Sequence, residues 1–234
     1  MKKVLFIILF WSWSILINIL FLPSLILPRK VVVFGQKIWA LGIVIILKRI
    51  LKLTYVIDGA EWLPKKPYII AIKHQSIWDT IILHLIDKDP AIVMKKELLK
   101  IPIYGWYCKK SKMIPIDRSA GLKSLKYMLQ EGKKAINANR NIIIFPQGTR
   151  VALKAKAPYL PGTYLLYNQL GITVIPCALN SGLFWPSKGW PSSHGIIRMR
   201  FLKPIKPGLE KKHFSKELEN SIETECNQLA NLIH

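Results

Sequence analysis

The chain has 234 residues, of which 35 are Lys or Arg and 13 are Asp or Glu, so its formal net charge at pH 7 is +22. A charge of this size predicts an anionic partner, either a nucleic acid or a membrane surface. The three cysteines, Cys108, Cys177 and Cys226, are an odd number without Cys-x-x-Cys spacing, which argues against a disulfide framework and against a zinc site.

The amino end of the chain is strongly apolar. Residues 4–27 carry no charge, and the polar breaks among them are Ser12, Ser14, Asn18 and Ser24. Because about 20 apolar residues are enough to cross the hydrocarbon of a bilayer, we expect a membrane-embedded helix here. A secretory signal peptide is the alternative, but the apolar region is too long for one and no small-x-small cleavage pattern precedes Arg29.

A second apolar stretch, residues 31–53, follows Pro23 and Pro28, which break the first helix. Lys37 interrupts this stretch and basic residues close it, which indicates a helix at the membrane interface. Basic residues flank both sides of the first segment, so they do not decide the orientation of a single crossing. We favour a two-helix hairpin over residues 1–55 that dips into one leaflet and leaves both flanks cytoplasmic, with a straight crossing as the alternative.

Residues 56–234 are enough for one domain with a substantial core, and their pattern predicts an α/β fold. Strands are expected at residues 68–73, 91–94, 112–117, 141–145, 173–179 and 196–201, with helical patterns between several of them. A last helix capped by Ser215 is expected to bury Leu218, Ile222, Cys226, Leu229 and Ile233. The aromatic stretch around Trp185 and Trp190 fits either the lipid interface or a packed surface loop.

A histidine and an aspartate follow the first predicted strand of this domain, in the run Lys73-His74-Gln75-Ser76-Ile77-Trp78-Asp79. Side chains five residues apart on a helix point about 140° apart, so these two can meet only across a turn. If Asp79 is the N-cap of the next helix, its carboxylate can hold one nitrogen of His74 and leave the other as a proton acceptor for general-base catalysis. The alternative is a capped helix with a merely hydrogen-bonded histidine.

A second polar loop, Phe145-Pro146-Gln147-Gly148-Thr149-Arg150, follows the strand at 141–145. Pro146 ends that strand, and Gly148 is free to take unusual dihedral angles. The guanidinium of Arg150 presents a planar fork of donors suited to phosphate, to which Thr149 and the Gly148 amide can add neutral donors. The loop therefore predicts an anion site where the strands end.

Together these segments resemble the lysophosphatidic acid acyltransferase family of glycerolipid acyltransferases, which is marked by His-x-x-x-x-Asp and Phe-Pro-Glu-Gly-Thr-Arg motifs. Residues 95–106, 113–118 and 174–179 are similar to further blocks of that family in the same order, so the resemblance covers residues 68–180. It implies a mixed central sheet flanked by helices. It also implies transfer of a fatty acyl chain from acyl-ACP or acyl-CoA to the free hydroxyl of lysophosphatidic acid, giving phosphatidic acid in phospholipid biosynthesis.

By position in these motifs, the resemblance assigns His74 as the base and Asp79 as its partner. It assigns the substrate phosphate and the pocket around it to Arg118, Gln147, Gly148, Thr149 and Arg150. We expect neither a metal ion nor an organic cofactor. The chain departs from the family pattern at Gln147, where most members have glutamate, and at Lys73, where asparagine is common. Glutamine can still form hydrogen bonds but cannot act as an acid or a base, and we expect Lys73 to point into solvent.

Two other functions remain open from the sequence. One is a membrane-associated lipid hydrolase that uses Ser76 as its nucleophile, although no Gly-x-Ser-x-Gly elbow accompanies this serine. The other is a membrane-anchored lipid-binding protein without turnover, a possibility raised by Gln147. Because the chain lacks a recognisable nucleic-acid module and has an apolar amino end, we expect the anionic partner to be the inner membrane, with the catalytic domain on its cytoplasmic side.

Overall fold

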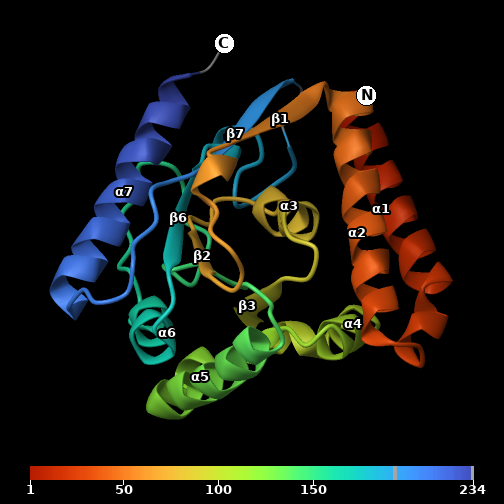
Figure 1. Cartoon of the computed structure of the whole chain (residues 1–234). Coiled ribbons are helices and arrows are strands. Elements are labelled where there is room, and N and C mark those ends of the chain that lie inside the picture. The colour runs from red at the N-terminus through yellow and green to blue at the C-terminus, as the bar shows by residue number, and fades with distance from the viewer. Residues whose placement is uncertain (192–193, 233–234) are drawn as a thin grey trace.

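A seven-stranded mixed sheet runs through the centre of the protein in the computed structural model, which describes residues 1–191 and 194–232 (Figure 1). The strand order is β1-β7-β6-β2-β5-β3-β4, and β6 with β7 is the antiparallel pair while the other neighbours are parallel. The strands are β1 (Leu53–Asp58), β2 (Ile69–Ile72), β3 (Ala91–Lys95), β4 (Ile114–Ile116), β5 (Ile142–Ile144), β6 (Val174–Leu179) and β7 (Gly195–Phe201). The predicted α/β class and mixed sheet are confirmed.

Helices cover both faces of this sheet (Figure 1). In β2, Ile70 and Ile72 face a core built with the first four helices, whereas Ile69 and Ala71 face a core built with the last three. A strand covered on both faces is apolar at every position, which is why this segment lacks polar alternation. The helices are α1 (Lys2–Leu20), α2 (Arg29–Ile46), α3 (Trp78–Ile86), α4 (Tyr104–Lys110), α5 (Gly121–Asn137), α6 (Gly162–Leu170) and α7 (Lys211–Asn231).

The strand β1 was not expected from the sequence. We expected the second apolar stretch to continue to Leu53, but α2 ends at Ile46 and passes into a π-helical turn, Leu47–Leu51. Lys52 then takes a left-handed conformation with φ of 54°, which ends the helix and starts the strand. β1 pairs with β7 at the edge of the sheet, so long-range pairing rather than a local apolar pattern makes it a strand.

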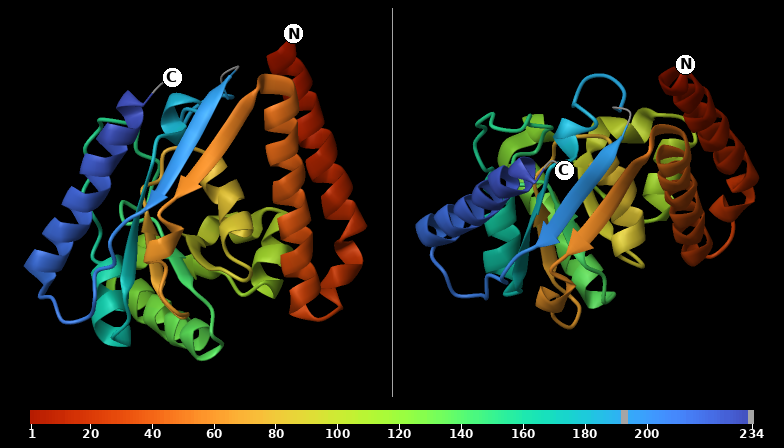
Figure 2. Two further views of the ribbon diagram at one scale, coloured as in Figure 1. Left: turned by 45° about the horizontal axis from the view of Figure 1, so that its top comes forward. Right: turned by 90° about the horizontal axis from the view of Figure 1, so that it is seen from above.

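The two N-terminal helices lie side by side along one flank of the sheet (Figure 2). Lys2–Leu20 and Arg29–Leu51 have mean hydropathies of 2.0 and 1.9, and both are long and apolar enough to cross a membrane. One side of α1 exposes a stripe of large apolar side chains, namely Val4, Leu5, Ile8, Trp11, Ile15, Leu16, Ile19 and Leu20. In water such a stripe is unfavourable, which fits a helix whose outer side contacts lipid.

The inner side of α1 is fixed to the sheet domain by a cluster of aromatic rings. Phe6 packs edge-on against Trp185 and Trp190, with ring centroids 5.8 and 6.1 Å apart, and Phe10 contacts the same two rings. Phe6 and Trp185 are fully buried. The tryptophan stretch is therefore a loop that packs against α1 and anchors it to the sheet domain.

The last helix begins earlier than predicted. α7 starts at Lys211, so Ser215 lies inside its first turns and is not the N-cap. The earlier start places Phe214 in the core, where its ring stacks on Tyr167 at 4.2 Å. The predicted stripe of Leu218, Ile222, Cys226 and Leu229 is buried, whereas Ile233 lies outside the described residues.

The aromatic contact predicts that Phe6→Ala destabilises the whole protein. Truncating a buried phenylalanine leaves a cavity that typically costs about 3–5 kcal/mol. Chemical unfolding of the detergent-solubilised protein, followed by tryptophan fluorescence, measures the loss. Ile8→Ala is the control, because Ile8 is 56% exposed on the same helix and its loss is expected to cost no more than about 0.5 kcal/mol. Equal losses in the two variants would contradict the packing role of α1.

Candidate active site

His74 and Asp79 are in direct contact just after β2. The distance from His74 Nδ1 to Asp79 Oδ2 is 2.9 Å. The same carboxylate oxygen accepts hydrogen bonds from the backbone amides of Gln75 at 2.6 Å and Ser76 at 2.8 Å. One oxygen thus closes the turn and holds the imidazole, as the five-residue spacing predicted.

The predicted capping role of Asp79 is wrong in one respect. α3 begins at Trp78 with Ile77 as its N-cap, so Asp79 lies in the first turn of the helix. Its carboxylate reaches back to the amides of the preceding loop rather than to amides further along the helix. An acidic side chain is still favourable there, because the helix dipole is positive at its N-terminus.

The carboxylate of Asp79 is fully buried and fully hydrogen-bonded. Its second oxygen, Oδ1, accepts from the hydroxyl of Ser76 at 3.1 Å and from the hydroxyl of Ser181. Burying a carboxylate costs free energy unless hydrogen-bond donors surround it. Here the two oxygens together accept hydrogen bonds from five donors. Since an ionised carboxylate only accepts, Nδ1 of His74 carries the ring proton and Nε2 is left as the acceptor.

Ser181 and Gln75 contribute to this site although the sequence analysis assigned them no role. Ser181 follows β6, which pairs in parallel with β2, so both strands end at the same edge of the sheet. Gln75 is fully buried and joins the loop after β2 to the end of β6. Its Nε2 donates to Leu179 O and its Oε1 accepts from Gly182 N, each at 2.9 Å. Two polar residues, Asn180 and Ser181, directly after a buried strand were the available sign of this contribution.

The two sequence motifs meet at His74. Its imidazole stacks on Phe145, with centroids 4.1 Å apart and an interplanar angle of 22°. Its backbone carbonyl accepts a hydrogen bond of 2.8 Å from Val151 N, the residue directly after Arg150. These contacts join the loop at residues 73–79, the histidine loop, to the loop at residues 145–150, the arginine loop. More than 70 residues separate His74 from its two partners in the chain.

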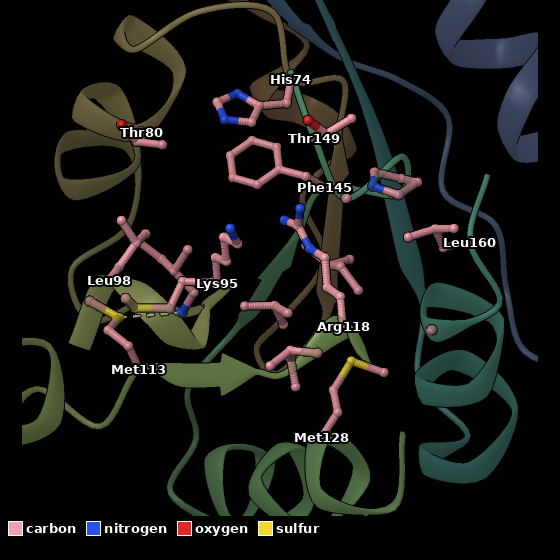
Figure 3. Close-up of a pocket in the computed structure, with 18 of the residues that line it drawn as sticks. His74, Thr80, Lys95, Leu98, Met113, Arg118, Met128, Phe145, Thr149 and Leu160 are labelled. Atoms are coloured by element: carbon pink, nitrogen blue, oxygen red, sulfur yellow. Dashed lines mark hydrogen bonds between the residues drawn. The ribbon is translucent and has the colours of Figure 1, made fainter. Parts of the chain in front are cut away.

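A cavity of about 690 Å³ opens beside His74 (Figure 3). Gly148, Thr149 and Arg150 line it from the loop after β5, and the Arg118 side chain extends toward His74 from the segment after β4. Arg118 has no hydrogen-bond partner within residues 1–191 and 194–232, whereas Arg150 donates to Ser187 O at 3.2 Å. Two further cations, Lys95 and Lys188, line the same mouth and were not expected there.

The far wall of the cavity is apolar. It is formed by Ile92, Met94, Leu98, Met113, Ile116, Leu125, Met128 and Ile144. Burial lowers the pKa of His84, which also lines this wall, to about 4, so this second histidine is a weak base at neutral pH. Burial raises the pKa of the Cys108 thiol to about 11, which leaves it protonated and a poor nucleophile. His74 is therefore the base that the cavity offers.

Two residues at which the chain departs from the family pattern lie away from the cavity. Gln147 was assigned to the substrate pocket, but its Nε2 lies 3.4 Å from Glu223 Oε1 on α7, and its side chain is not part of the cavity lining. Lys73 was expected in solvent, but its side chain is 1% exposed and pairs with Glu223. Successive side chains on a strand point to opposite faces, so Lys73 faces α7 while His74 faces the cavity.

The residues described by the structure hold no group of three or more His, Cys, Asp or Glu side chains arranged to bind a metal ion. The three cysteines are each buried and free.

Comparison with known proteins places this fold and this pair of motifs in one class. The acyltransferase family model matches residues 55–180, which span β1 to the end of β6 and hold both motifs. The chain belongs to the acyltransferase family.

Individual relatives agree with this assignment. The chain is 35% identical over 147 residues to a 1-acyl-sn-glycerol-3-phosphate acyltransferase of Pseudomonas aeruginosa, a match that covers 63% of this chain and 57% of the relative. It is 30% identical over 166 residues to the enzyme of the same name from Saccharomyces cerevisiae, covering 68% and 54%. The chain thus spans a little more than half the length of these curated relatives.

One solved structure shares the complete architecture. The crystal structure of the 1-acyl-sn-glycerophosphate acyltransferase PlsC from Thermotoga maritima superposes with a TM-score of 0.78 at 20% sequence identity. The match covers 98% of each chain and therefore includes the two N-terminal helices.

The geometry of the dyad predicts the tautomer of His74. Nuclear magnetic resonance of protein labelled with ¹⁵N-histidine, assigned with a His74→Gln variant, is expected to show neutral His74 protonated at Nδ1. The Asp79 carboxylate fixes this tautomer by accepting the Nδ1 proton. A neutral ring protonated mainly at Nε2 would contradict the assignment of Nε2 as the proton acceptor.

Proposed function

We propose that this protein transfers a fatty acyl chain from an acyl thioester, acyl-ACP or acyl-CoA, to the free hydroxyl of lysophosphatidic acid, and so makes phosphatidic acid for phospholipid biosynthesis. The observation that carries the proposal is one cavity with three properties. It presents the Nε2 side of an Asp-oriented histidine, a mouth with Arg118 and Arg150, and a long apolar wall. A base, an anion site and a lipid-compatible surface are what this reaction needs.

In the proposed reaction, His74 Nε2 takes the proton of the glycerol hydroxyl as the oxygen attacks the thioester carbonyl. The new ester bond forms, the carbon–sulfur bond breaks, and the imidazolium returns the proton to the departing thiolate. Asp79 stabilises the transient imidazolium through the 2.9 Å contact at Nδ1. The nucleophile comes from the substrate, so no acyl-enzyme is required.

We assign the substrate phosphate to Arg118 and Arg150. Their guanidiniums present forked hydrogen-bond donors. Within the described residues the guanidinium of Arg118 has no hydrogen-bond partner, so its donors are available to a ligand. The donors of the Gly148–Thr149 segment add to this anion site. Gly148 itself has φ of 67°, a conformation that residues with a side chain rarely adopt, so a substitution there would strain the loop that carries Arg150.

The apolar wall is where we place an acyl chain, and we place the protein on an anionic membrane. Residues 1–55 would be the membrane anchor, with the exposed stripe of α1 in lipid, and residues 56–234 the catalytic domain. The net charge of +22 favours an anionic surface, to which each nearby Lys or Arg adds about 1 kcal/mol of attraction. We keep the hairpin topology at the inner membrane, with the catalytic domain on the cytoplasmic side.

The contacts of Ser76 weigh against the hydrolase alternative. Its hydroxyl is fully buried and donates to Asp79 Oδ1, so it does not face the cavity beside His74.

One assay separates the candidate functions: purified protein in mixed micelles receives lysophosphatidic acid and acyl thioester. Phosphatidic acid indicates a transferase, free fatty acid a hydrolase, and binding without product a lipid-binding protein.

His74→Ala is expected to lower transfer by about 10²- to 10⁴-fold, the range typical for loss of a general base, while the variant stays folded. Formation of radiolabelled phosphatidic acid measures the rate. His213→Ala is the control, since His213 is exposed at the start of α7 and distant in sequence from both motifs. Turnover that is unchanged in His74→Ala would remove the proposed base.

Arg118→Ala is expected to raise KM for lysophosphatidic acid about 10- to 100-fold with a smaller effect on kcat, because a charge-assisted hydrogen bond is worth about 1.5–3 kcal/mol. Initial rates at varied lysolipid and saturating thioester separate the two constants. Lys123→Ala removes an exposed positive charge near the start of α5 whose side chain is not part of the cavity lining, and controls for general loss of charge. An equal rise in KM for both variants would show that bulk charge, not Arg118, binds the phosphate.

A further inference from the structure

A buried lysine lies directly before the candidate base. Lys73 is 1% exposed, and its ammonium group forms an ion pair with Glu223 of α7. Burying an ammonium is costly unless an opposite charge compensates it. Within the described residues, Glu223 is the carboxylate in ion-pair contact with Lys73, and it comes from 150 residues further along the chain.

The same carboxylate is bonded to the second motif as well. Glu223 Oε1 accepts from Tyr159 Oη at 2.9 Å and lies 3.4 Å from Gln147 Nε2. Burial, and after it the Glu223 carboxylate, raise the pKa of Tyr159, so its hydroxyl keeps the proton that it donates. Leu160, the next residue, donates its amide to Pro146 O at 2.8 Å, which ties this segment to the arginine loop.

α7 has one further contact with the walls of the site. Asn180 Nδ2 donates to Leu229 O at 3.0 Å, and the neighbouring Ser181 donates to Asp79. α7 lies on the face of the sheet opposite α1, α2 and α3, so it reaches the site from behind (Figure 1). From behind the sheet, α7 therefore contacts one residue next to each of His74, Gly148 and Ser181, namely Lys73, Gln147 and Asn180.

We propose that Glu223 is a positioning residue for the acyl transfer proposed above, on which this inference rests. By binding Lys73, Gln147 and Tyr159 with one carboxylate, it fixes His74 relative to the Gly148–Arg150 loop from behind the sheet. Glu223 contacts no reacting atom and acts through its three partners.

The charge balance of this cluster explains why a neutral side chain stands at position 147. One ammonium, Lys73, is neutralised by one carboxylate, Glu223, and Gln147 adds an uncharged donor to it. A glutamate at position 147 would place a second carboxylate about as close to Glu223 as Gln147 Nε2 is now, 3.4 Å, and the two like charges would repel. Gln147 and Glu223 together therefore give the cluster one carboxylate for its one ammonium.

The test is a set of four variants: Glu223→Gln, Gln147→Glu, the double variant that combines them, and Glu217→Gln. Glu223→Gln leaves Lys73 without a negative partner, and Gln147→Glu supplies one carboxylate too many. Each is expected to lower kcat/KM on the order of 10- to 100-fold, the size of effect that a small misplacement of catalytic groups produces. The double variant returns one carboxylate to the cluster and is expected to recover most of that loss. Glu217→Gln removes an exposed charge from the same helix and is expected to be silent.

Two readouts distinguish positioning from stability and from failure of the proposed function. Transfer rates are measured well below each variant's unfolding temperature, where every variant is folded. A low rate then reports misaligned catalytic groups and not unfolding. The ¹⁵N resonances of His74 are measured without substrate. We expect them to shift in both single variants and to return in the double variant, whether or not the wild type makes phosphatidic acid. Unchanged His74 resonances and rates in Glu223→Gln, or a double variant no better than the single ones, would overturn the proposal.

Discussion

The structure of the candidate site depends on one buried carboxylate. Asp79 is fully buried, and its two oxygens bind the His74 imidazole, two backbone amides and two serine hydroxyls. Leaving such a group without donors would cost several kcal/mol, so the loop after β2 folds around it and the segment after β6 supplies Ser181. The same contacts orient the imidazole, so one group meets a folding requirement and the requirement of the proposed catalysis.

Much of this arrangement follows from the sequence because it depends on local or periodic constraints. Five of the strands, β2 to β6, are largely apolar runs followed by polar loops, and because they run parallel they bring those loops to one edge of the sheet. A spacing of five residues required a turn between His74 and Asp79, and the turn is there. The placement of Arg118, Gly148, Thr149 and Arg150 around one cavity followed from the family resemblance, which supplied the pairing of distant segments.

The features missed from the sequence depend on contacts between distant parts of the chain. β1 pairs with β7 at the edge of the sheet, and its segment, although rich in residues that favour strands, had been interpreted as following directly on the apolar helical stretch. Lys73 was expected in solvent because lysine usually is, but Glu223 of α7 compensates its charge inside the protein. Gln147 was placed in the pocket by its motif, yet its side chain turns to the same glutamate. The two side-chain errors share one origin, a partner more than 70 residues away, whereas the errors at Asp79 and Ser215 concern where a helix begins.

The central claim is that His74 and the two arginines act on one substrate in one cavity. The most direct measurement is a structure of the protein in lipid with lysophosphatidic acid bound and no thioester present. We predict the free hydroxyl at about 2.6–3.2 Å from His74 Nε2, with the phosphate bound by Arg118 and Arg150. A lysolipid whose phosphate lies away from both arginines, or whose hydroxyl cannot reach His74, would contradict the account.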